Sequence, residues 1–342
     1  MDYSSAKNRS GTAVLLLNVG TPDSADVASV RRYLSQFLND PYVIDLPWLA
    51  RKLLVNLIIV PFRAPKSTKL YRKLWNEGGS PLLYLSNRLQ HKLQMGSNNQ
   101  HDWFVAMRYG NPSVGTVLRQ IKQAGYKKLV ILPLFPQYAL STTETALQEV
   151  SFQLKKLAFQ PDIKIINQFY SHRGFIHAFA SRIRYAGYQQ GDYLLFSYHG
   201  LPVSHIQKIH PQVDCAQCSC QFAIPEHGAN CYKATCYETS RLLAAELGLS
   251  ADSYTTSFQS RFSKNWLTPF TDETLKDLAD KGVKRVVVAA PSFVTDCLET
   301  IIEIGEEYQQ LFIQAGGKEL VMVESLNDSD LWVSALHEIV GQ

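Results

Sequence analysis

The chain has 342 residues, of which 46% are hydrophobic and 19% charged, and its formal net charge is +4. This length exceeds one ordinary hydrophobic core and suits two packed domains. The mild charge, without a basic helix or a run of Lys and Arg, argues against a nucleic-acid partner.

The N-terminal end, MDYSSAKNRSGT (1–12), is polar and lacks the apolar core of a signal peptide, which predicts a cytoplasmic protein. The longest apolar run, LLVNLIIVP (53–61), falls far short of the roughly 20 residues that a spanning helix needs. Trp48 and Phe62 lie beside it, with Lys52 and Arg63 as flanking cations. Two interpretations stay open: a peripheral contact with the inner membrane face, or a buried helix under a loop.

Short apolar runs rich in β-branched residues recur along the chain between helical patterns, as in parallel strands buried on both faces. Eight such runs predict strands at 13–19, 103–109, 128–134, 163–169, 192–199, 253–260, 284–291 and 319–325. Helical patterns lie between most of them, for example at 27–38, 237–248 and 272–282.

Two sets of four strands predict an α/β protein with two Rossmann-like, doubly wound domains, each with a four-stranded parallel sheet. We expect an N-terminal domain at 11–172 and a C-terminal domain at 173–325, the latter carrying a Cys-rich insert at 211–236. We expect residues 326–342 to form a helix that packs back on the first domain. In such folds ligands bind beyond the carboxyl ends of the strands, so the predicted active site is a cleft between the domains.

One candidate catalytic residue, His199, ends the predicted strand FSYHGLP (196–202). The following Gly and Pro stop the strand and fix a turn, which places His199 at a rigid edge. An imidazole with an ordinary pKa near 6.5 can accept protons at neutral pH.

The segment FVTDCLETIIEIGEEY (293–308) predicts a helix with five carboxylates and no Lys or Arg. Asp296, Glu299, Glu303 and Glu307 fall within about 80° of one another on an α-helical wheel. The alternative is a solvated face, but solvated faces usually mix both signs. A row of oxygen ligands is suited to attracting a divalent cation, and Gly305 predicts a bulge in the helix.

Five of the six cysteines cluster within 22 residues: Cys215, Cys218, Cys220, Cys231 and Cys236. In a cytoplasmic chain this clustering favours a metal centre over disulfides. Four thiolates suit a [2Fe–2S] cluster or a structural zinc, and His205, His210 and His227 keep zinc open. Unligated thiols are the third interpretation, and the spacing does not decide which four residues bind.

Aromatic and basic residues gather in the loops at the predicted cleft. Together they would suit a large, flat, apolar molecule that carries carboxylates. They are Arg63, Lys66, Tyr71, Arg108, Tyr109, Phe135, Tyr138, Trp266 and Phe293.

The motifs as a set resemble the ferrochelatase family, in order and from about residue 13 to 338. They are NVGTP (18–22), EGGSPL (77–82), RYGNP (108–112), FPQYALSTT (135–143), FSYHGLP (196–202), SFQSRF (257–262), WLTPFTDE (266–273), FVTDCLETIIEI (293–304) and ESLND (324–328). The resemblance implies a chelatase fold and the insertion of Fe²⁺ into a porphyrin, with release of two protons. It also implies π-helical turns in the acidic helix.

The resemblance further implies roles for single residues. His199, Glu299 and Asp296 match the catalytic centre, and Glu303 and Glu307 match a proposed metal or proton path, with His199 and Glu299 also as metal ligands. Porphyrin-contact positions are matched by Val19, Arg63, Lys66, Tyr71, Ser80, Arg108, Tyr109, Trp266 and Phe293.

Val19 stands where coproporphyrin-using relatives carry Tyr, which favours protoporphyrin IX as the porphyrin substrate and ferrous iron as its partner. Three alternatives stay open: a coproporphyrin III ferrochelatase, a chelatase for another tetrapyrrole, and a non-catalytic haem or porphyrin carrier. A sirohydrochlorin-type chelatase usually has two or more His at its site, whereas FSYHGLP supplies one. The sequence leaves the oligomeric state open.

Overall fold

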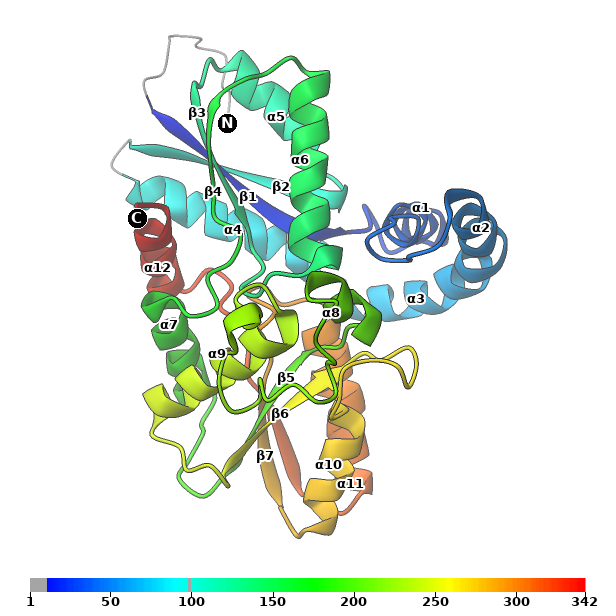
Figure 1. Cartoon of the computed structure of the whole chain (residues 1–342), viewed down its shortest axis with the longest axis vertical. Helices are drawn as coiled ribbons and strands as arrows, with labels where there is room; N and C mark the ends of the chain where they lie inside the picture. Colours follow the sequence, from blue (N-terminus) through cyan, green and yellow to red (C-terminus); the bar gives the residue numbers. More distant parts are fainter. Residues whose placement is uncertain (1–10, 98–99, 342) are drawn as a thin grey trace. The chain divides into compact units, whose positions relative to one another are not determined.

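The computed structural model describes residues 11–97 and 100–341, which form two α/β units (Figure 1). Unit 1 contains residues up to Phe135, Leu140–Gln168 and the end of the chain from Val340. Unit 2 contains Pro136–Ala139 and Phe169–Ile339. Residues 1–10, which form most of the polar N-terminal stretch, lie outside the described residues.

Unit 1 is built on a parallel sheet of four strands in the order β2-β1-β3-β4. The central strand pairs on both sides, with Leu15 opposite both Phe104 and Ile131. Because β1 is covered on both faces, its run of apolar residues is buried without alternation. The strands are β1 (Thr12–Thr21), β2 (His101–Gly110), β3 (Lys128–Pro133) and β4 (Asp162–Ile165).

Helices cover both faces of this sheet. Leu15 and Ile131 pack in one core cluster with Leu118 of α5 (Val114–Gln123) and Val150 of α6 (Thr145–Lys156). A short π-helical turn, η2 (Leu140–Glu144), precedes α6. Helix α4 (Pro81–Gly96) packs against β1 and β2.

A helical arm projects from the sheet of unit 1 (Figure 1). It consists of α1 (Val27–Leu38), α2 (Trp48–Leu53), the π-helical η1 (Leu54–Ile59) and α3 (Val60–Leu74). Asp26 caps α1 by accepting hydrogen bonds from the N–H groups of Ala28 and Ser29.

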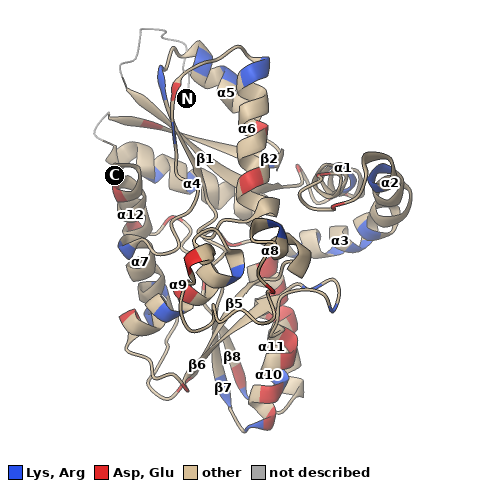
Figure 2. Ribbon diagram, in the orientation of Figure 1, with Lys and Arg blue, Asp and Glu red and all other residues tan. Residues whose placement is uncertain are grey.

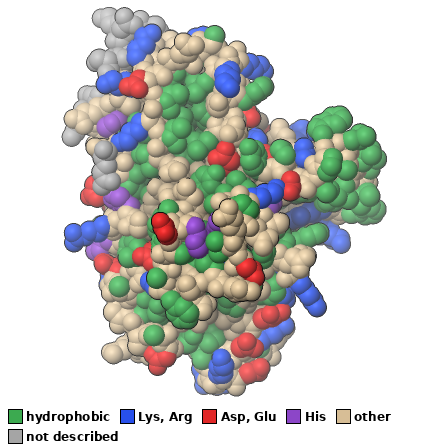
Figure 3. Space-filling view, in the orientation of Figure 1, with side chains coloured by type: hydrophobic (Ala, Val, Ile, Leu, Met, Phe, Trp, Pro, Cys, Tyr) green, Lys and Arg blue, Asp and Glu red, His purple; other side chains and the backbone are tan. Residues whose placement is uncertain are grey.

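The outer side of this arm is apolar and exposed, and hydrophobic side chains gather over it in Figure 3. Trp48 is 65% exposed, Leu57 66% and Phe62 73%. Only the inner side is buried, through residues such as Val55 and Val60. The interpretation of 53–61 as a buried helix is therefore wrong, because Leu53, Leu57 and Ile58 are each more than half exposed.

Unit 2 repeats the same plan, with the parallel strand order β6-β5-β7-β8. Its strands are β5 (Tyr193–His199), β6 (Tyr254–Gln259), β7 (Arg285–Ala289) and β8 (Glu319–Met322). One face packs against α10 (Thr271–Asp280), the π-helical η4 (Glu299–Tyr308) and α11 (Gln309–Gln314). The remaining helices are α7 (Arg173–Tyr185), α8 (Val203–Ile209), η3 (Glu226–Gly228), α9 (Tyr232–Leu247) and α12 (Asp330–Gly341).

The predicted fold class is confirmed, since all eight predicted runs form strands in two four-stranded parallel sheets. Five strands end earlier than predicted, by the widest margins β4 at Ile165 and β8 at Met322, and by one or two residues β3, β6 and β7. Helix α1 has the predicted bounds.

The C-terminal helix α12 belongs mostly to unit 2. The indole of Trp332 in α12 is fully buried in unit 2, with ring centroids 5.5 Å from Phe169 and 6.0 Å from Phe175. Only the end of α12, from Val340, groups with unit 1, where its carbonyl accepts a hydrogen bond from Lys164. Burial of the large indole decides where most of this helix packs.

In each sheet the second strand in the chain lies on one side of the first strand and the third strand lies on the other side. The strand order reverses there, which makes β1/β3 and β5/β7 the topological switch points. Ligands of such sheets bind beyond the carboxyl ends of the strands at these points. Within the described residues, no helix is long and apolar enough to cross a membrane.

Candidate active site

His199 is the last residue of β5, at the switch point of unit 2. Its Nδ1 lies 2.6 Å from the carbonyl oxygen of Gly200. Because a carbonyl only accepts, Nδ1 carries a proton, and in the neutral ring the free lone pair is then on Nε2. The ring is partly buried, with centroid distances of 6.3 Å to Trp266 and 6.2 Å to Phe293. Two of the predicted porphyrin-contact residues therefore flank the predicted proton acceptor.

Glu303 is largely enclosed by hydrogen-bond donors. It accepts from the N–H of Ser260 at 2.9 Å, from the Ser260 hydroxyl at 2.5 Å and from the Tyr308 hydroxyl at 2.7 Å. Gln259 Nε2 adds a longer contact of 3.4 Å. Burial raises the pKa of Glu303, and the charge of Glu299 raises it further, while the Ser260 and Tyr308 hydrogen bonds and the charge of His199 oppose the shift.

Ser260 makes this arrangement possible by adopting a left-handed backbone conformation, with φ of +61°. Non-glycine residues rarely hold this conformation, and such strain tends to persist at functional sites. It aims both the N–H and the hydroxyl of Ser260 at one carboxylate.

Glu299 opens the π-helical η4 and is partly buried. Gln259 Nε2 donates to its backbone carbonyl at 3.1 Å, and Gln259 is the strand partner of His199. Both Glu299 and His199 act electrostatically on Glu303, so Glu303 lies in the neighbourhood of each. Imidazole and carboxylates thus share one end of the sheet of unit 2.

The predicted acidic stripe has a different geometry from the α-helical wheel. The helix begins at Leu298 and not at 293, so Asp296 precedes it. From Glu299 to Tyr308 the turns are π-helical, and Gly305 lies within them. The three glutamates differ in exposure, from the enclosed Glu303 to the exposed Glu307. Burial, more than mutual repulsion, shifts the titration of Glu303.

Asp296 is 4% exposed and has both oxygens occupied. Oδ1 accepts from the Thr300 hydroxyl at 2.9 Å and the Ser325 N–H at 3.1 Å, and Oδ2 accepts from Asn327 Nδ2 at 2.7 Å. A carboxylate with these bonds holds the start of η4 against the segment that follows β8.

Glu307 lines an open groove of about 510 Å³ on the outer side of unit 2. Lys276 and Asp280 of α10 face it, with Gln310 and Gln314 of α11. Figure 2 shows acidic residues gathered along α10 and the neighbouring helix. Glu307 therefore lies at a solvated polar surface.

In unit 1, three of the predicted porphyrin-contact residues share one cluster. Tyr109 is buried there, and Val19 and Tyr71 pack partly buried against the same group. Tyr71 also lies 6.4 Å, centroid to centroid, from both Tyr33 and Trp75. Ser80 is buried, 2.8 Å from the hydroxyl of Thr21. Arg63 and Lys66 are exposed on α3.

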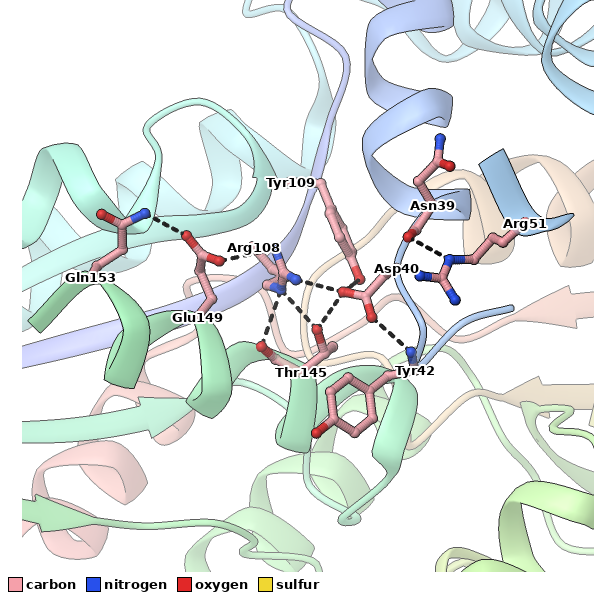
Figure 4. A network of polar contacts seen from close by, with 9 residues as sticks. All are labelled: Asn39, Asp40, Tyr42, Arg51, Arg108, Tyr109, Thr145, Glu149 and Gln153. Atoms are coloured by element: carbon pink, nitrogen blue, oxygen red, sulfur yellow. Dashed lines mark hydrogen bonds and ion pairs between the residues drawn. The ribbon is translucent and has the colours of Figure 1, made fainter. Parts of the chain in front are cut away.

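Arg108 is engaged in a polar network centred on Asp40 (Figure 4). Its guanidinium donates to Asp40 Oδ2 at 2.5 Å and to the Thr145 hydroxyl at 2.9 Å, and it lies 3.7 Å from Glu149. The Tyr109 hydroxyl donates to the same Asp40 oxygen at 2.9 Å. The cation predicted to meet a ligand carboxylate already has carboxylate partners within unit 1.

The cysteine segment gathers four thiols, of Cys215, Cys218, Cys220 and Cys231. All but Cys218 are buried. Burial raises the pKa of Cys220 to about 12 and raises the pKa of Cys215 and Cys231, and a charge on Cys218 would raise all three further. The thiols of Cys218 and Cys220 are also hydrogen-bonded to each other.

Two histidines approach these thiols. His210 Nε2 lies 3.2 Å from Cys231 Sγ, and His227 Nε2 lies 3.6 Å from Cys218 Sγ. His210 is 7% exposed, and its buried Nδ1 has no hydrogen-bond partner. Among residues 11–97 and 100–341, no three His, Cys, Asp or Glu side chains are arranged to hold a metal ion. The donor chemistry of the segment fits a metal centre, whereas its ligand geometry is not formed.

Sequence reasoning missed three residues around Glu303. Tyr308 ends the acidic segment, and nothing in its residue type marks its hydroxyl as a donor to Glu303. Ser260 and Gln259 stand in a noted motif, but nothing in their residue types marks them as partners of a glutamate more than 40 positions away. Only the strand pairing of His199 with Gln259 could have pointed to them.

Comparison with known proteins gives a consistent family. A family model described as Ferrochelatase matches residues 11–342. The ferrochelatase of Legionella pneumophila (strain Corby) is 44% identical over 330 residues, covering 96% of this chain and 98% of the relative. The ferrochelatases of Coxiella burnetii (strain CbuK_Q154) and Pseudomonas fluorescens are 43% and 41% identical, each across 96% of this chain and across 93% and 96% of the relatives.

Among solved structures, SirB from Bacillus subtilis with Fe3+ matches with a TM-score of 0.55 and 11% identity. The match covers 97% of this chain and 94% of SirB. A multi-domain protein from Deinococcus radiodurans with structural similarity to chelatases matches with a TM-score of 0.50 and 10% identity, over 96% of this chain and 54% of that one. At these identities the likeness concerns the fold alone.

Proposed function

The chain belongs to the ferrochelatase family, and from this premise we propose that it inserts Fe²⁺ into protoporphyrin IX, releasing two protons and forming protohaem. It is a lyase of the metal-chelatase class. The iron and the porphyrin are both substrates, so the protein must remove two pyrrole protons and deliver one cation.

One observation supports this function above the others: the Nδ1 of His199 is hydrogen-bonded to a backbone carbonyl, so Nε2 is the atom of the neutral ring that can accept a proton. Its Nδ1 proton is held by the Gly200 carbonyl, which fixes the tautomer and leaves Nε2 to accept a pyrrole proton. The rings of Trp266 and Phe293 lie near the imidazole and would present apolar surfaces to a macrocycle.

We propose that Glu299 and Glu303 receive the iron and pass the protons onward, with His199 and Glu299 as metal ligands. Glu303, whose pKa burial raises, can hold a proton more readily than an exposed glutamate and lose it as a cation approaches. Ser260 and Tyr308 stabilise its charged form, so neither state of Glu303 is strongly excluded. Glu307 would collect cations at the solvated groove.

Asp296 has a different role in this proposal. Because its oxygens are occupied by Thr300, Ser325 and Asn327, it acts by holding the first turn of η4, and with it Glu299. It is a positioning residue and not a proton carrier.

For the porphyrin, we propose that the partly buried Val19 and Tyr71 supply apolar contact, with the buried Tyr109 packed in the same cluster, and that the exposed Arg63 and Lys66 meet propionates. Ser80, bonded to Thr21, holds the strand-end loop of β1. Arg108 supports Asp40 and Tyr109 and does not itself bind a propionate.

The function is tested by incubating the protein with Fe²⁺ and protoporphyrin IX without oxygen and following pyridine-haemochrome absorption. We expect haem to accumulate over many turnovers. A carrier would bind porphyrin and produce no haem beyond one equivalent. Replacing protoporphyrin IX by coproporphyrin III should lower kcat/KM, because Val19 offers no group to a more polar ring; an equal or higher value would reverse the substrate assignment.

We further propose that the cysteine segment holds a [2Fe–2S] cluster through Cys215, Cys218, Cys220 and Cys231. The four thiols of this segment match the donor set of such a cluster, and the thiols of Cys218 and Cys220 are hydrogen-bonded to each other. Cys236 is the odd one out, since its fully buried thiol contacts the Tyr232 hydroxyl. When bound, such a cluster supplies one-electron chemistry and joins the ends of the segment.

Zinc is the second candidate for this segment, because His210 and His227 approach Cys231 and Cys218 and these four would form a Cys₂His₂ set. Absorption of freshly purified protein and metal analysis separate the two. Charge-transfer bands with two irons per chain support the cluster, whereas a colourless protein with one zinc supports the alternative. A protein that contains neither metal would overturn both.

Finally, we propose that the protein is cytoplasmic and touches the inner membrane through the exposed side of the arm. Trp48, Leu57, Ile58 and Phe62 are each more than half exposed. Burying each such side chain in lipid would contribute about 1.5–3 kcal/mol, and the cations of α3 would favour anionic lipids.

Flotation with anionic vesicles tests this contact. We expect the protein to float with the vesicles, and the variant Leu57→Asp combined with Phe62→Asp to remain in solution. The matched control, Phe152→Asp, changes an exposed apolar residue of α6 that lies outside the arm. Equal binding by the double variant would exclude the arm as the membrane contact.

A further inference from the structure

Helix α9 begins where the cysteine segment ends. Cys231 is its N-cap residue and Tyr232 its first residue. The Tyr232 side chain is 6% exposed, so it points inward from the segment to the interior of unit 2. No role in the chemistry described above has been assigned to it.

The Tyr232 hydroxyl donates to the backbone carbonyl of His199 at 2.9 Å. The same hydroxyl bonds to Ser292, whose Oγ accepts from the backbone N–H of His199 at 3.3 Å. The backbone of His199 is thus held on both sides by two groups that are bonded to each other.

These bonds replace part of the sheet. The ladder between β5 and β7 ends at the pair Phe196 and Ala289, three residues before His199. On the other side the ladder still reaches Gln259, which accepts from the N–H of Gly200 at 2.8 Å. The strand end that presents the imidazole therefore depends on Tyr232 and Ser292 where β7 gives no support.

On its other side Tyr232 is tied to the thiols. It follows Cys231 directly, and its hydroxyl contacts the thiol of Cys236 one turn further along α9. Binding or loss of a metal at Cys231 would displace this N-cap residue and with it the first turn of α9. Tyr232, the first residue of α9, would move with it.

We propose that Tyr232 is a positioning residue that ties His199 to the cysteine segment, so that the state of the segment sets the position of the catalytic imidazole. The proposal rests on the proton-accepting role of His199 given above. It requires no particular metal in the segment, because the link is made by residues of the chain itself.

The first test is Tyr232→Phe, which removes only the hydroxyl. We expect kcat to fall about fivefold, the usual effect of one lost hydrogen bond, with the KM for porphyrin unchanged. The matched control is Tyr198→Phe: Tyr198 is fully buried next to His199 in the chain, but its hydroxyl bonds to Ser240 at 3.0 Å. Equal effects of the two variants would reduce Tyr232 to a structural residue and overturn the proposal.

The second test reads the link without activity. Histidine labelled at ¹³Cε1 gives one signal per residue, and His199→Gln identifies the signal of His199. We expect Cys231→Ser, which keeps a good N-cap residue, to shift this signal. In the Tyr232→Phe background the same substitution should leave the signal where it is, while in the Tyr198→Phe background the shift should persist.

A His199 signal that ignores Cys231→Ser, or one that shifts equally with and without the Tyr232 hydroxyl, would overturn the coupling. Neither result bears on haem formation by the unaltered protein, which tests the proposed function by itself. Metal analysis of the same samples separates a failed coupling from a failed cluster assignment.

Discussion

Two carboxylates, Asp40 in unit 1 and Glu303 in unit 2, are withdrawn from water near the carboxyl ends of their sheets but have different partners. Asp40 meets the guanidinium of Arg108 together with the hydroxyls of Tyr109 and Thr145 (Figure 4). Glu303 meets Ser260, Tyr308 and Gln259, and in the described part of the chain it forms no ion pair with Lys or Arg.

The difference separates a structural carboxylate from one suited to chemistry. A buried charge with a permanent cation and saturated hydrogen bonds has no reason to change its protonation state. A buried carboxylate with neutral donors only lies between states, and burial raises the pKa of Glu303 accordingly. The missing cation beside Glu303 leaves room for a substrate cation.

The largest expected effect is on kcat and concerns His199, the proposed proton acceptor near Glu303. His199→Ala should lower kcat about 10²- to 10⁴-fold, the usual contribution of a positioned acid–base group. Haem formation under anaerobic conditions measures it. His177→Ala is the control, since that exposed imidazole pairs with Glu246 on the surface. A loss below tenfold would show that proton removal does not depend on His199, and the comparison would lose its chemical side.

Next in size is the structural side of the comparison. Asp40→Ala leaves Arg108, whose side chain is 19% exposed, without its main partner, and should lower the free energy of unfolding by about 3 kcal/mol. Urea denaturation measures it. Asp23→Ala removes an exposed pair with Arg32 and should cost less than about 1 kcal/mol. If the two variants were equally stable, the Asp40 network would not be the structural counterpart of Glu303.

Glu303→Gln should behave in the opposite way, with little loss of stability and about a tenfold loss of kcat. The amide keeps the shape of the side chain and one acceptor oxygen but cannot carry a charge or release a proton. Parallel measurement of haem formation and of the urea midpoint distinguishes the two effects. An unstable but fully active variant would show that Glu303, like Asp40, has a structural role and no role in the chemistry.

The order of these expectations shows which parts of the site the sequence could supply. The buried runs of β1 and β5 predicted both sheets, because a strand covered on both faces needs a continuous apolar segment, and His199 followed from its place at a strand end. The donors of Glu303 could not be predicted, because Ser260 depends on an unusual backbone conformation and Tyr308 on the π-helical turns of η4. An α-helical wheel placed the acidic residues on one face of one helix, whereas Asp296 precedes the helix and its carboxylate is fully hydrogen-bonded.

Arg108 illustrates the same limit in unit 1. A basic residue in a strand-end motif suggests a ligand contact, and the motif gives no sign that Arg108 is hydrogen-bonded to Asp40, 68 positions earlier. Sequence patterns predict which residues reach a strand end, and they do not predict which of them are paired there.

A smaller effect is expected in the pH dependence of stability, which separates Glu303 from Asp40 by its titration. The folded-state pKa of Glu303 is raised above its ordinary value of 4.5, so the protonated form is favoured by folding. Its contribution to stability is therefore complete below pH 4.5 and is lost as the pH rises through the folded-state value. Thermal unfolding of the unaltered protein and of Glu303→Gln should differ by a slope of this sign above pH 4.5. Parallel curves would mean that Glu303 titrates normally.

The smallest effect is expected at the outer end of η4, where Glu307 is exposed. Glu307→Gln should raise the KM for Fe²⁺ about two- to threefold and leave kcat unchanged, because a screened surface charge helps to collect a cation but does not take part in the proton steps. Asp277→Asn makes the same change of charge on the exposed face of α10, away from the residues that line the groove. A fall in kcat for Glu307→Gln would extend the chemical role of the enclosed Glu303 to the surface, whereas equal KM values for the two variants would end the path at Glu303.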